Sequence, residues 1–501
     1  MSNEKIYISD IITDDLINSF KQGEKYLIES QTGSGKSYMI QNNLYNYAVK
    51  NNKRILLLSN RVILRDQNKV DLGEEKLRVI TPINYQYFEK RVYEDQISLD
   101  ELYFGYDYIV MDEVHYIFAD ASFSRKTDLL IETIINPPKD KVLILISATP
   151  QILKRFNKIK KENIHTVQYD YSYIKNLYFY NKRTAPEGII KTLPDNQKVI
   201  YFSDAKSAQE LANKFENAEF ICSRSNQHYY TPKMDKIYLE IVKNSQFREN
   251  ILCATKVLDN GINIKDSSVT TIIIDEMEII TLIQELGRKR ILDSNDNINL
   301  YIRNQNNGFI RNELRLINAQ LKHLSDFENM ELIDFIKKYK KMDYSSVIDH
   351  DMQVNIAVKQ RLLYLKEEYE QIIKHPDGYK LRIYELLGIN HKGFRSVYNK
   401  LKKKQETRLI YNNGDDYTEK LLLINLMSKY RGLILDSDQQ EKFKYEFFNV
   451  LFSSRKLSFK NRGILSINSI LREENAAYTI HSFKKQANNT RKRYWKILPL
   501  D

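Results

Sequence analysis

The 501-residue chain contains 42% hydrophobic and 28% charged residues, values typical of a globular protein rather than a disordered one. The first thirty residues lack the apolar run of a secretory signal, and nowhere do about 18 apolar residues follow one another. We therefore expect a cytoplasmic protein of about three domains that spans no membrane. With only Cys222 and Cys253, zinc clusters, iron–sulfur clusters and disulfide frameworks are disfavoured, and both cysteines are predicted to be small buried hydrophobes.

The net charge of +12 is unevenly distributed along the chain. Residues 391–501 contain 23 Lys+Arg against 11 Asp+Glu, so the first 390 residues are neutral overall. A polyanion is the obvious partner for the basic C-terminal region, and a solvated basic surface is the alternative.

Short β-rich apolar runs alternate with amphipathic helical stretches from Tyr26 to Arg303, which predicts parallel sheets built from β-α-β units. Beyond Asn304 helical periodicity prevails. We predict an α/β chain with two parallel-sheet domains in tandem and a mainly helical, basic C-terminal domain, at residues 1–165, 166–305 and 306–501. The expected strands are 26–29, 55–59, 78–81, 108–111 and 142–147 in the first sheet, and 176–180, 198–202, 219–222, 250–254, 270–275 and 298–302 in the second.

A glycine-rich segment, residues 31–37, follows the first predicted strand and directly precedes a helix, which is the context of a phosphate-binding P-loop. Glycines let backbone N–H groups surround phosphate, Lys36 would reach the β- and γ-phosphates of ATP, and the Ser37 hydroxyl would bind Mg²⁺. A Gly-Ser-rich turn is the alternative, and Ser30 stands where the strict pattern has glycine. The residues predicted to bind ATP are Thr32, Gly33, Ser34, Gly35, Lys36 and Ser37.

An acidic segment, Asp112-Glu113-Val114-His115, follows the strand predicted at 108–111. Ligands of open α/β sheets bind at the carboxyl ends of the strands, so this segment and the P-loop should meet in one crevice. Asp112 is expected to hold Mg²⁺, and Glu113 to orient and deprotonate the water that attacks the γ-phosphate. Capping of a helix is the alternative for such an acidic pair.

These motifs, followed by Ser147-Ala148-Thr149, resemble those of the superfamily 2 helicases, with DEVH as a DExH box and SAT as motif III. The resemblance covers about residues 20–305 and implies two RecA-like domains. It also implies that His115, Ser147 and Thr149 relay the nucleotide state to bound nucleic acid. For His115, a simple buried helix residue is the alternative.

Two further segments of the first sheet are similar to helicase motifs Ia and Ib, with Arg61 and with Thr81 in a loop after the third strand. In the family such loops bind the phosphate backbone, which suits a guanidinium and a hydroxyl. Loop capping is the alternative for both residues.

In the second sheet, the segment from Gln284 to Arg290 resembles motif VI, QxxGRxxR, on a predicted helix. The resemblance implies that Gln284 belongs to the catalytic site and that Arg288 is the arginine finger that stabilises the transition state. Ile291 stands where the family has its second arginine, and Arg290 lies one residue early. Arg290 is expected to contact the γ-phosphate if the helix is locally adjusted; a solvated basic helix face is the alternative.

Residues 251–263 resemble motif V. There Thr255 would touch the nucleic-acid backbone, Gly261 would permit a tight turn, and Asn263 would lie near the ribose, where the family usually has aspartate. Ser203, after the strand at 198–202, matches motif IV and is expected to contact nucleic acid, with helix capping as the alternative.

The basic C-terminal region has two notable segments. Residues 384–404 resemble a helix-turn-helix, with a helical hairpin as the alternative. Lys484-Lys485 and residues 491–495 interleave cations with aromatic rings, which suits phosphate contact and base stacking, with a frayed basic terminus as the alternative. Such a domain could widen the grip on nucleic acid, separate strands or recruit a protein partner.

The sequence as a whole predicts an ATP- and Mg²⁺-dependent helicase or translocase that moves on a single strand, with DNA favoured over RNA. An RNA helicase, and a nucleic-acid-binding or loading factor in which ATP only switches affinity, are the alternatives. No oligomeric state is indicated.

Overall fold

The computed structural model of the chain forms two compact units. The first comprises Met1–Asp170, Asn306–Arg382 and Ile389–His391, and the second comprises Tyr171–Gln305, Ile383–Gly388 and Lys392–Asp501. The described residues are 6–59, 72–119, 121, 128–156, 159–167, 169–194, 196–224, 226–259, 262–340, 347–348, 352–387, 423–424, 426–450, 463–473, 477–487 and 490–499.

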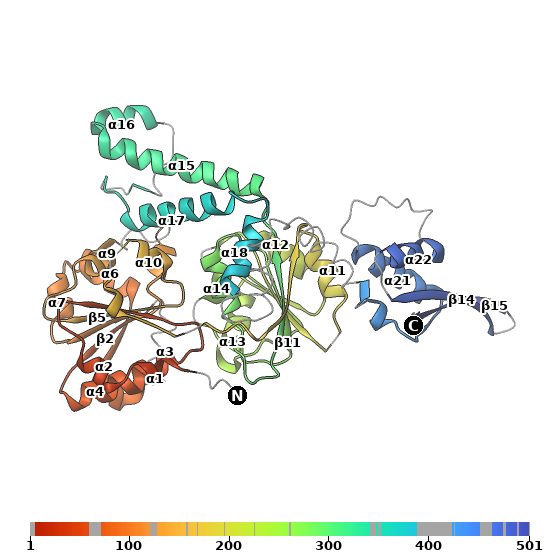
Figure 1. Ribbon diagram of the computed structural model, residues 1–501, viewed down its shortest axis with the longest axis horizontal. Coiled ribbons are helices and arrows are strands. Elements are labelled where there is room, and N and C mark those ends of the chain that lie inside the picture. The colour runs from red at the N-terminus through yellow and green to blue at the C-terminus, as the bar shows by residue number, and fades with distance from the viewer. Residues whose placement is uncertain are drawn as a thin grey trace. The chain divides into compact units, whose positions relative to one another are not determined.

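The first unit contains a six-stranded parallel sheet of order β3-β2-β4-β5-β1-β6. Figure 1 shows helices α1 to α4 over one face and α6, α9 and α10 over the other. The strands are β1 (Lys25–Glu29), β2 (Ile55–Ser59), β3 (Ile80–Asn84), β4 (Tyr108–Met111), β5 (Val142–Ser147) and β6 (Ile164–Thr166). The helices are α1 (Ile8–Ile11), α2 (Asp14–Asn18), α3 (Lys36–Tyr38), η1 (Met39–Leu44), α4 (Tyr45–Lys50), α6 (Tyr85–Tyr93), α7 (Leu99–Tyr103), α8 (Tyr116–Ala119), α9 (Asp128–Ile135), α10 (Gln151–Phe156) and η2 (Lys161–Asn163).

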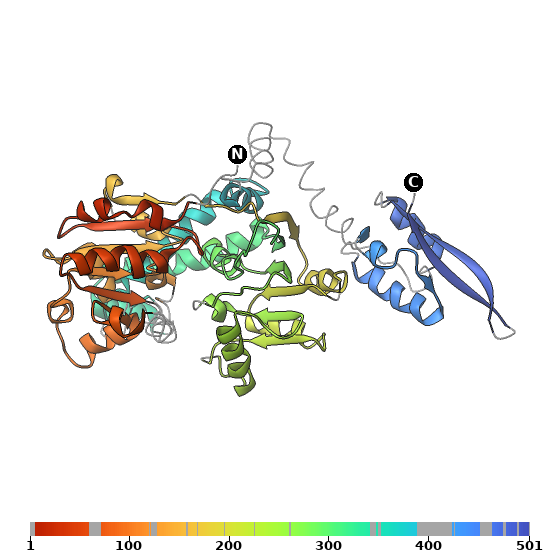
Figure 2. The ribbon, with the colours of Figure 1, turned by 90° about the horizontal axis from the view of Figure 1, so that it is seen from below.

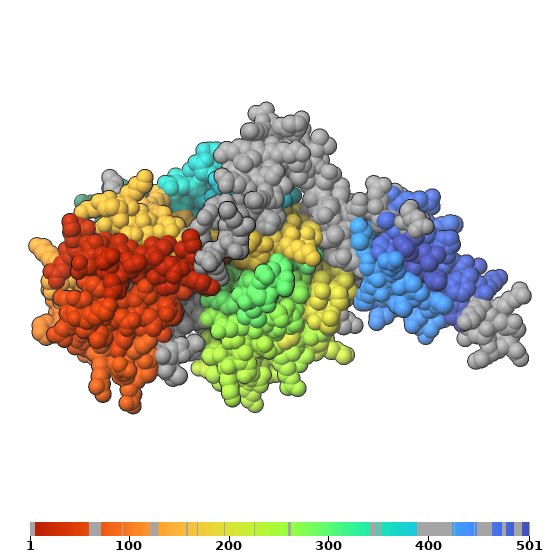
Figure 3. All heavy atoms as spheres, turned by 60° about the horizontal axis from the view of Figure 1, so that its bottom comes forward, coloured from red at the N-terminus to blue at the C-terminus, as the bar shows by residue number. Residues whose placement is uncertain are grey.

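The second unit contains another six-stranded parallel sheet, of order β7-β12-β11-β8-β10-β9. Its strands are β7 (Ile174–Tyr180), β8 (Lys198–Phe202), β9 (Ala218–Ile221), β10 (Ile251–Ala254), β11 (Val269–Ile274) and β12 (Ile298–Arg303). Its helices are α11 (Ala185–Lys191), α12 (Ala205–Ala212), α13 (Pro232–Asn244), η3 (Lys256–Asp259) and α14 (Ile279–Leu286). In the space-filling view each sheet with its helices forms a compact body, coloured red to orange and yellow to green (Figure 3).

Hydrophobic sequence explains both sheets. The central strands ILLLS (β2) and VLILIS (β5) are buried at every position, as expected for parallel strands covered on both faces. The predicted α/β class with two parallel sheets in tandem is therefore confirmed. Cys222 and Cys253 are buried, as predicted for small hydrophobes.

Between the second sheet and Leu387 the described residues form four helices, as the helical periodicity predicted: α15 (Asn307–Asn329), α16 (Leu332–Tyr339), α17 (Ile356–Ile372) and α18 (Gly378–Leu387). In the first unit, α17 packs against α8 and α10. Arg155 of α10 donates two hydrogen bonds to the carboxylate of Glu367 in α17, over 2.7 and 2.6 Å. None of the helices in the described ranges is long and apolar enough to cross a lipid bilayer.

The last described residues combine helices with an antiparallel sheet that the helical periodicity does not anticipate. The strand order is β13-β15-β14, and β14 and β15 form a long hairpin (Figures 1 and 2). The elements are β13 (Ile434–Leu435), α21 (Ser437–Val450), α22 (Ile464–Glu473), β14 (Tyr478–Ala487) and β15 (Thr490–Pro499). The predicted helix-turn-helix lies outside the described residues after Leu387, and the bounds of the three predicted domains remain a prediction.

Candidate functional site

The loop after β1 turns through two glycines. Gly33 and Gly35 have φ of +84° and +88°, a conformation that only glycine adopts without strain. The helix that begins at Lys36 follows directly, and a helix N-terminus favours anions. The Ser34 hydroxyl is buried without a hydrogen-bond partner in the described part of the chain. A phosphate oxygen could accept from that hydroxyl, so the loop fits a nucleotide phosphate.

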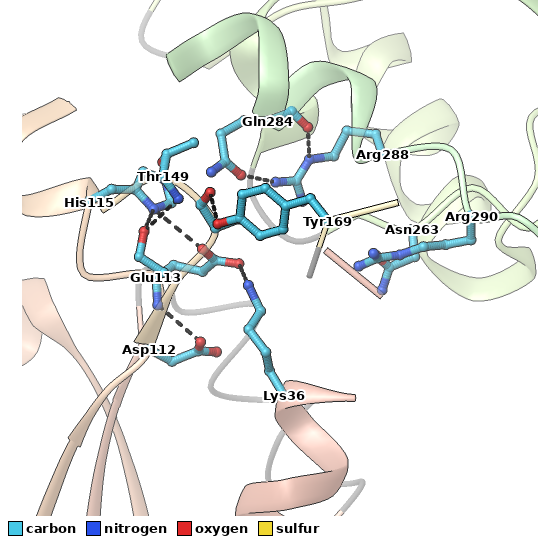
Figure 4. A network of polar contacts seen from close by, with 12 residues as sticks. Lys36, Asp112, Glu113, His115, Thr149, Tyr169, Asn263, Gln284, Arg288 and Arg290 are labelled. Carbon is cyan, nitrogen blue, oxygen red and sulfur yellow. Dashed lines mark hydrogen bonds and ion pairs between the residues drawn. The ribbon is translucent and has the colours of Figure 1, made fainter. Parts of the chain in front are cut away.

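Lys36 and Glu113 lie together, although 76 residues separate them in the sequence. Lys36 Nζ lies 2.6 Å from Glu113 Oε1, and the lysine side chain is only 9% exposed. Figure 4 marks this contact with a dashed line. Burial raises the pKa of Glu113. The charge of Lys36 and then the contacts with His115 lower that pKa by more than burial raises it, so the pKa lies well below its ordinary value. Glu113 is therefore an ionised carboxylate.

The pKa of Asp112 shifts in the opposite direction from that of Glu113. Burial, and then the negative charge of Glu113, raise the pKa of Asp112 to about 6. Its Oδ1 accepts a hydrogen bond from the Glu113 backbone N–H over 3.0 Å. A cation would relieve the cost of ionising this carboxyl, and carboxylate and hydroxyl oxygens suit Mg²⁺. Asp112 and the exposed hydroxyl of Ser37 therefore fit the predicted magnesium ligands.

A short polar chain connects Glu113 with the end of β5. His115 Nδ1 lies 3.3 Å from Glu113 Oε2 and 3.2 Å from Ser147 Oγ, and the Thr149 backbone N–H donates to Ser147 Oγ over 3.0 Å (Figure 4). His115 lies in the turn before α8, not inside a helix. The residues predicted to couple nucleotide state to nucleic acid are thus in contact with the candidate base.

The Glu113 backbone is held in an unfavourable conformation. Its φ is +51°, in the left-handed region that residues with a Cβ rarely adopt. Hydrogen bonds fix the turn on both sides, because Asp112 N–H donates to Leu58 O over 2.9 Å and Val114 N–H donates to Ile146 O over 3.0 Å. The neighbouring strands β2 and β5 therefore impose the position of the carboxylate.

In the second unit, Arg288 is tied to the end of α14. Its Nε donates to the backbone carbonyl of Gln284 and its Nη2 to Gln284 Oε1, each over 3.0 Å. Both side chains are buried, with Arg288 only 3% exposed. This geometry does not match the alternative of a solvated basic helix face.

Arg288 lies in the turn that follows α14 and Lys289 in a β-bridge, which corrects the prediction that the two arginines lie on a helix. Helix α14 ends at Leu286, and Lys289 forms a parallel β-bridge with Ile264. Ile264 N–H donates to the carbonyl of Arg288, and Arg290 N–H donates to the carbonyl of Ile264, each over 2.8 Å. The two arginine side chains are held by different partners, Arg288 by Gln284 and Arg290 by Asn263.

Lys289, between the two arginines, has a buried partner. Lys289 Nζ lies 2.5 Å from Asp296 Oδ2, and the two side chains are 0% and 1% exposed. Arg290 instead donates from Nε to Asn263 Oδ1 over 2.7 Å (Figure 4). Asn263, predicted to lie near the ribose, is therefore a partner of Arg290.

The structure says less about the remaining residues that were predicted to bind nucleotide or nucleic acid. Thr255 follows β10, and its Oγ1 accepts from the Val257 backbone N–H over 3.4 Å. Ser203 is buried after β8, and the neighbouring Asp204 caps α12 by accepting from Ser207 N–H over 3.0 Å. Arg61 and Gly261 lie outside the described residues.

Thr81 was expected in a loop after the third strand, but it lies inside that strand. It pairs with Leu56 inside β3, which runs on to Asn84, and Pro82 pairs with Leu57. A proline lacks the N–H that a central strand needs, but β3 is an edge strand and tolerates it. The prediction ended the strand too early because the Thr-Pro pair resembles a strand end.

Three polar contacts near these motifs escaped the sequence analysis. The buried Tyr85 hydroxyl donates to the carbonyl of Asp112 over 2.8 Å. The Tyr169 hydroxyl donates to the carbonyl of Ala148 over 2.8 Å, and Asp296 neutralises Lys289. None of the three belongs to a local motif, and only the tyrosine-rich composition around residue 169 gave a signal.

Comparisons with known proteins give partial matches. Residues 7–77, which include the phosphate-binding loop, match the family model described as Type III restriction enzyme, res subunit. No curated protein matches the chain. Among solved structures, Saccharomyces cerevisiae Dbp5 bound to RNA and ADP BeF3 is 16% identical, over 56% of this chain and 78% of that one, with a TM-score of 0.39. The Escherichia coli DEAH/RHA helicase HrpB is 12% identical, over 60% of this chain and 42% of that one, with a TM-score of 0.38.

Proposed function

We propose that the protein is an ATP-dependent nucleic-acid helicase or translocase of the DExH type that acts on DNA. The observation that carries this proposal is the contact between Lys36 and Glu113 at the carboxyl edge of the first sheet. It joins a phosphate-binding cation to an ionised carboxylate beside a loop that fits phosphate. The family-model match over residues 7–77 includes this loop and supports the proposal.

The chemistry is hydrolysis of the γ-phosphate of ATP. Lys36 exchanges its ion pair with Glu113 for the β- and γ-phosphates. The carboxylate of Glu113 then takes a proton from the attacking water. The water oxygen bonds to the γ-phosphorus as the bond to the bridging oxygen of ADP breaks. Mg²⁺, held by Ser37 and Asp112, would neutralise charge on the phosphates.

Arginine side chains of the second domain complete this proposal. Arg288 stabilises the charge that develops in the transition state, and Arg290 contacts the γ-phosphate. Gln284 holds Arg288 through two hydrogen bonds. Hydrolysis then requires groups from both domains, which makes it sensitive to their arrangement.

Nucleic acid is the proposed regulator of that arrangement. The contacts from Glu113 through His115 and Ser147 to Thr149 offer a path between the nucleotide site and the nucleic-acid-binding residues. The residues proposed to bind the phosphate backbone are Arg61, Thr81, Ser203 and Thr255.

A strand-displacement assay on matched DNA and RNA duplexes with single-stranded tails of either polarity tests the proposal. We expect ATP-dependent displacement of DNA, and none by the Lys36→Ala variant. Displacement of RNA alone would replace DNA by RNA as the substrate. Binding of either nucleic acid without displacement would favour an ATP-switched binding or loading factor.

A further inference from the structure

The hairpin of β14 and β15 has one packed and one free face. Cross-strand partners in an antiparallel pair share a face, and successive pairs alternate. Ile480, Trp495 and Ile497 are buried on the first face. Backbone groups of the hairpin are fixed by the helices, because Asn468 of α22 bonds both the N–H and the carbonyl of Ile480, over 2.8 and 2.9 Å. The hairpin is therefore an ordered ribbon, not a frayed terminus.

The other face of the ribbon, which we call the free face, carries a pair of rings. Phe483 lies opposite Tyr494, the ring centroids are 6.0 Å apart and the planes are inclined by 28°. Both rings are only partly buried. On the same face the next pair is His481 opposite Lys496. An accessible aromatic pair beside a cation suits a nucleobase and its phosphate.

The charged residues of the ribbon are all of one sign. Residues 478–499 contain six Lys+Arg and no Asp or Glu. Lys484 lies directly opposite Arg493 on the face that also carries Ile480 and Trp495, and both side chains are exposed beyond the packed part of that face. In the part of the chain that the structure describes, neither has a carboxylate partner. Like charges directly opposite each other destabilise a hairpin, so this pair does not contribute to folding. Its positive charge instead suits the binding of a polyanionic ligand.

We infer that the hairpin is a binding surface for single-stranded nucleic acid. Unpaired bases stack on Phe483 and Tyr494 beside Lys496 on the free face. Lys484 and Arg493, which project from the other face, contact phosphates where the nucleic-acid strand passes around the edge of the ribbon. A single strand is the occupant because base pairs in a duplex do not present the faces of their bases to a side chain. The inference deepens the proposed function and rests on it only in taking nucleic acid as the ligand.

The first test is equilibrium binding of the full-length protein to a single-stranded oligothymidylate and to the oligouridylate of the same length, without ATP. Two neutralised phosphate contacts on a single strand change the slope of log K against log salt by about 1.4. Lys484→Gln/Arg493→Gln should therefore bind about 25-fold more weakly at about 0.1 M salt and match wild type at about 1 M. As a control of equal charge, Arg311→Gln/Lys322→Gln on exposed positions of α15 should keep the wild-type slope.

The second test separates binding from folding. In Lys484→Glu the introduced carboxylate faces Arg493, and opposite charges across a strand pair stabilise a hairpin. We expect a thermal unfolding midpoint at or above that of wild type together with weaker binding. Phe483→Ile/Tyr494→Ile keeps β propensity but removes the rings, and should weaken binding at least about fivefold at every salt concentration.

The outcomes distinguish the two proposals. Wild-type affinity and salt slope in the hairpin variants, or equal losses in the α15 control, would overturn the hairpin assignment and leave the proposed function in place. Equal weakening on blunt duplex DNA would also overturn it, in favour of a groove-binding ribbon. Failure of the wild-type protein to bind either oligonucleotide would contradict the proposed function itself. Similar losses on both oligonucleotides support phosphate and base contacts that do not read the sugar.

Discussion

Lys36 Nζ lies 2.6 Å from Glu113 Oε1, and this ion pair connects the loop after β1 with the turn after β4. The charge of Lys36 is the main stabilising influence on the ionised Glu113 carboxylate. Lys36→Ala removes the cation that would bind phosphates and also the charge that keeps the pKa of Glu113 low. We expect ATP turnover to fall at least about 100-fold, measured as steady-state phosphate release. Lys50→Ala, at an exposed ion pair on α4, should retain activity; equal activity of both variants would exclude the role of Lys36.

Arg288 and Arg290 should differ in their contributions. Arg288→Ala removes the proposed finger, and arginine fingers contribute about 10³-fold or more to turnover. We expect a loss of that order with ATP affinity retained, and a smaller loss in Arg290→Ala. Arg248→Ala, an exposed position in the same unit, is the control. Measured kcat and ATP dissociation constants decide the outcome, and an unchanged kcat in Arg288→Ala would remove that residue from the mechanism.

Asp112 makes the stability of the protein depend on pH. The carboxyl pKa rises from its ordinary 3.8 to about 6 on folding, so the folded state holds the proton more tightly. The free energy of unfolding then falls as the pH rises from about 4 to about 6 and stays low above that range. Asp112→Asn should be more stable than wild type by up to about 3 kcal/mol above pH 6 and equal to it near pH 4.

Denaturant unfolding across this pH range, in buffer without divalent cations, measures the difference. Asp100→Asn at an exposed site is the control and should show no such gain at high pH. A gain in stability of Asp112→Asn that grows as the pH falls would contradict the prediction.

The buried pair of Lys289 and Asp296 should be important for stability. Removing one partner leaves an uncompensated buried charge, so Lys289→Ala is expected to lower the free energy of unfolding by about 3–5 kcal/mol. The double variant Lys289→Met/Asp296→Leu should recover most of this loss, because no charge remains buried. Lys243→Ala on the exposed side of α13 should change stability by less than about 0.5 kcal/mol. A single variant as stable as this control would show that the pair is not buried.

Much of the fold was predictable because parallel strands are continuous apolar runs. The strand at 142–147 was predicted with its observed bounds, since all of its residues are buried. By contrast, β6 has three residues that are not fully buried, and its sequence does not stand out. The hairpin of β14 and β15 was missed because its strands are rich in polar residues and are stabilised by cross-strand pairs and by α21 and α22.

The candidate site was predictable where a local motif defines it. The contact of Lys36 with Glu113 follows from two motifs at the carboxyl ends of parallel strands. The end of α14 before the two arginines did not follow, because the bridge that Lys289 forms with Ile264 joins residues that are distant in sequence. Tyr85 could not be identified, since its partner is a backbone carbonyl that has no signature in the sequence.

The central claim is that nucleic acid controls ATP hydrolysis by this protein. The most direct measurement is the steady-state rate of ATP hydrolysis by the full-length chain with and without single-stranded DNA and RNA. Glu113→Gln is the reference, because it should bind ATP with its P-loop intact and lose at least about 100-fold in turnover without the general base. We predict that DNA raises the wild-type rate and leaves that of Glu113→Gln unchanged. An equal wild-type rate with DNA, with RNA and with neither would contradict the account.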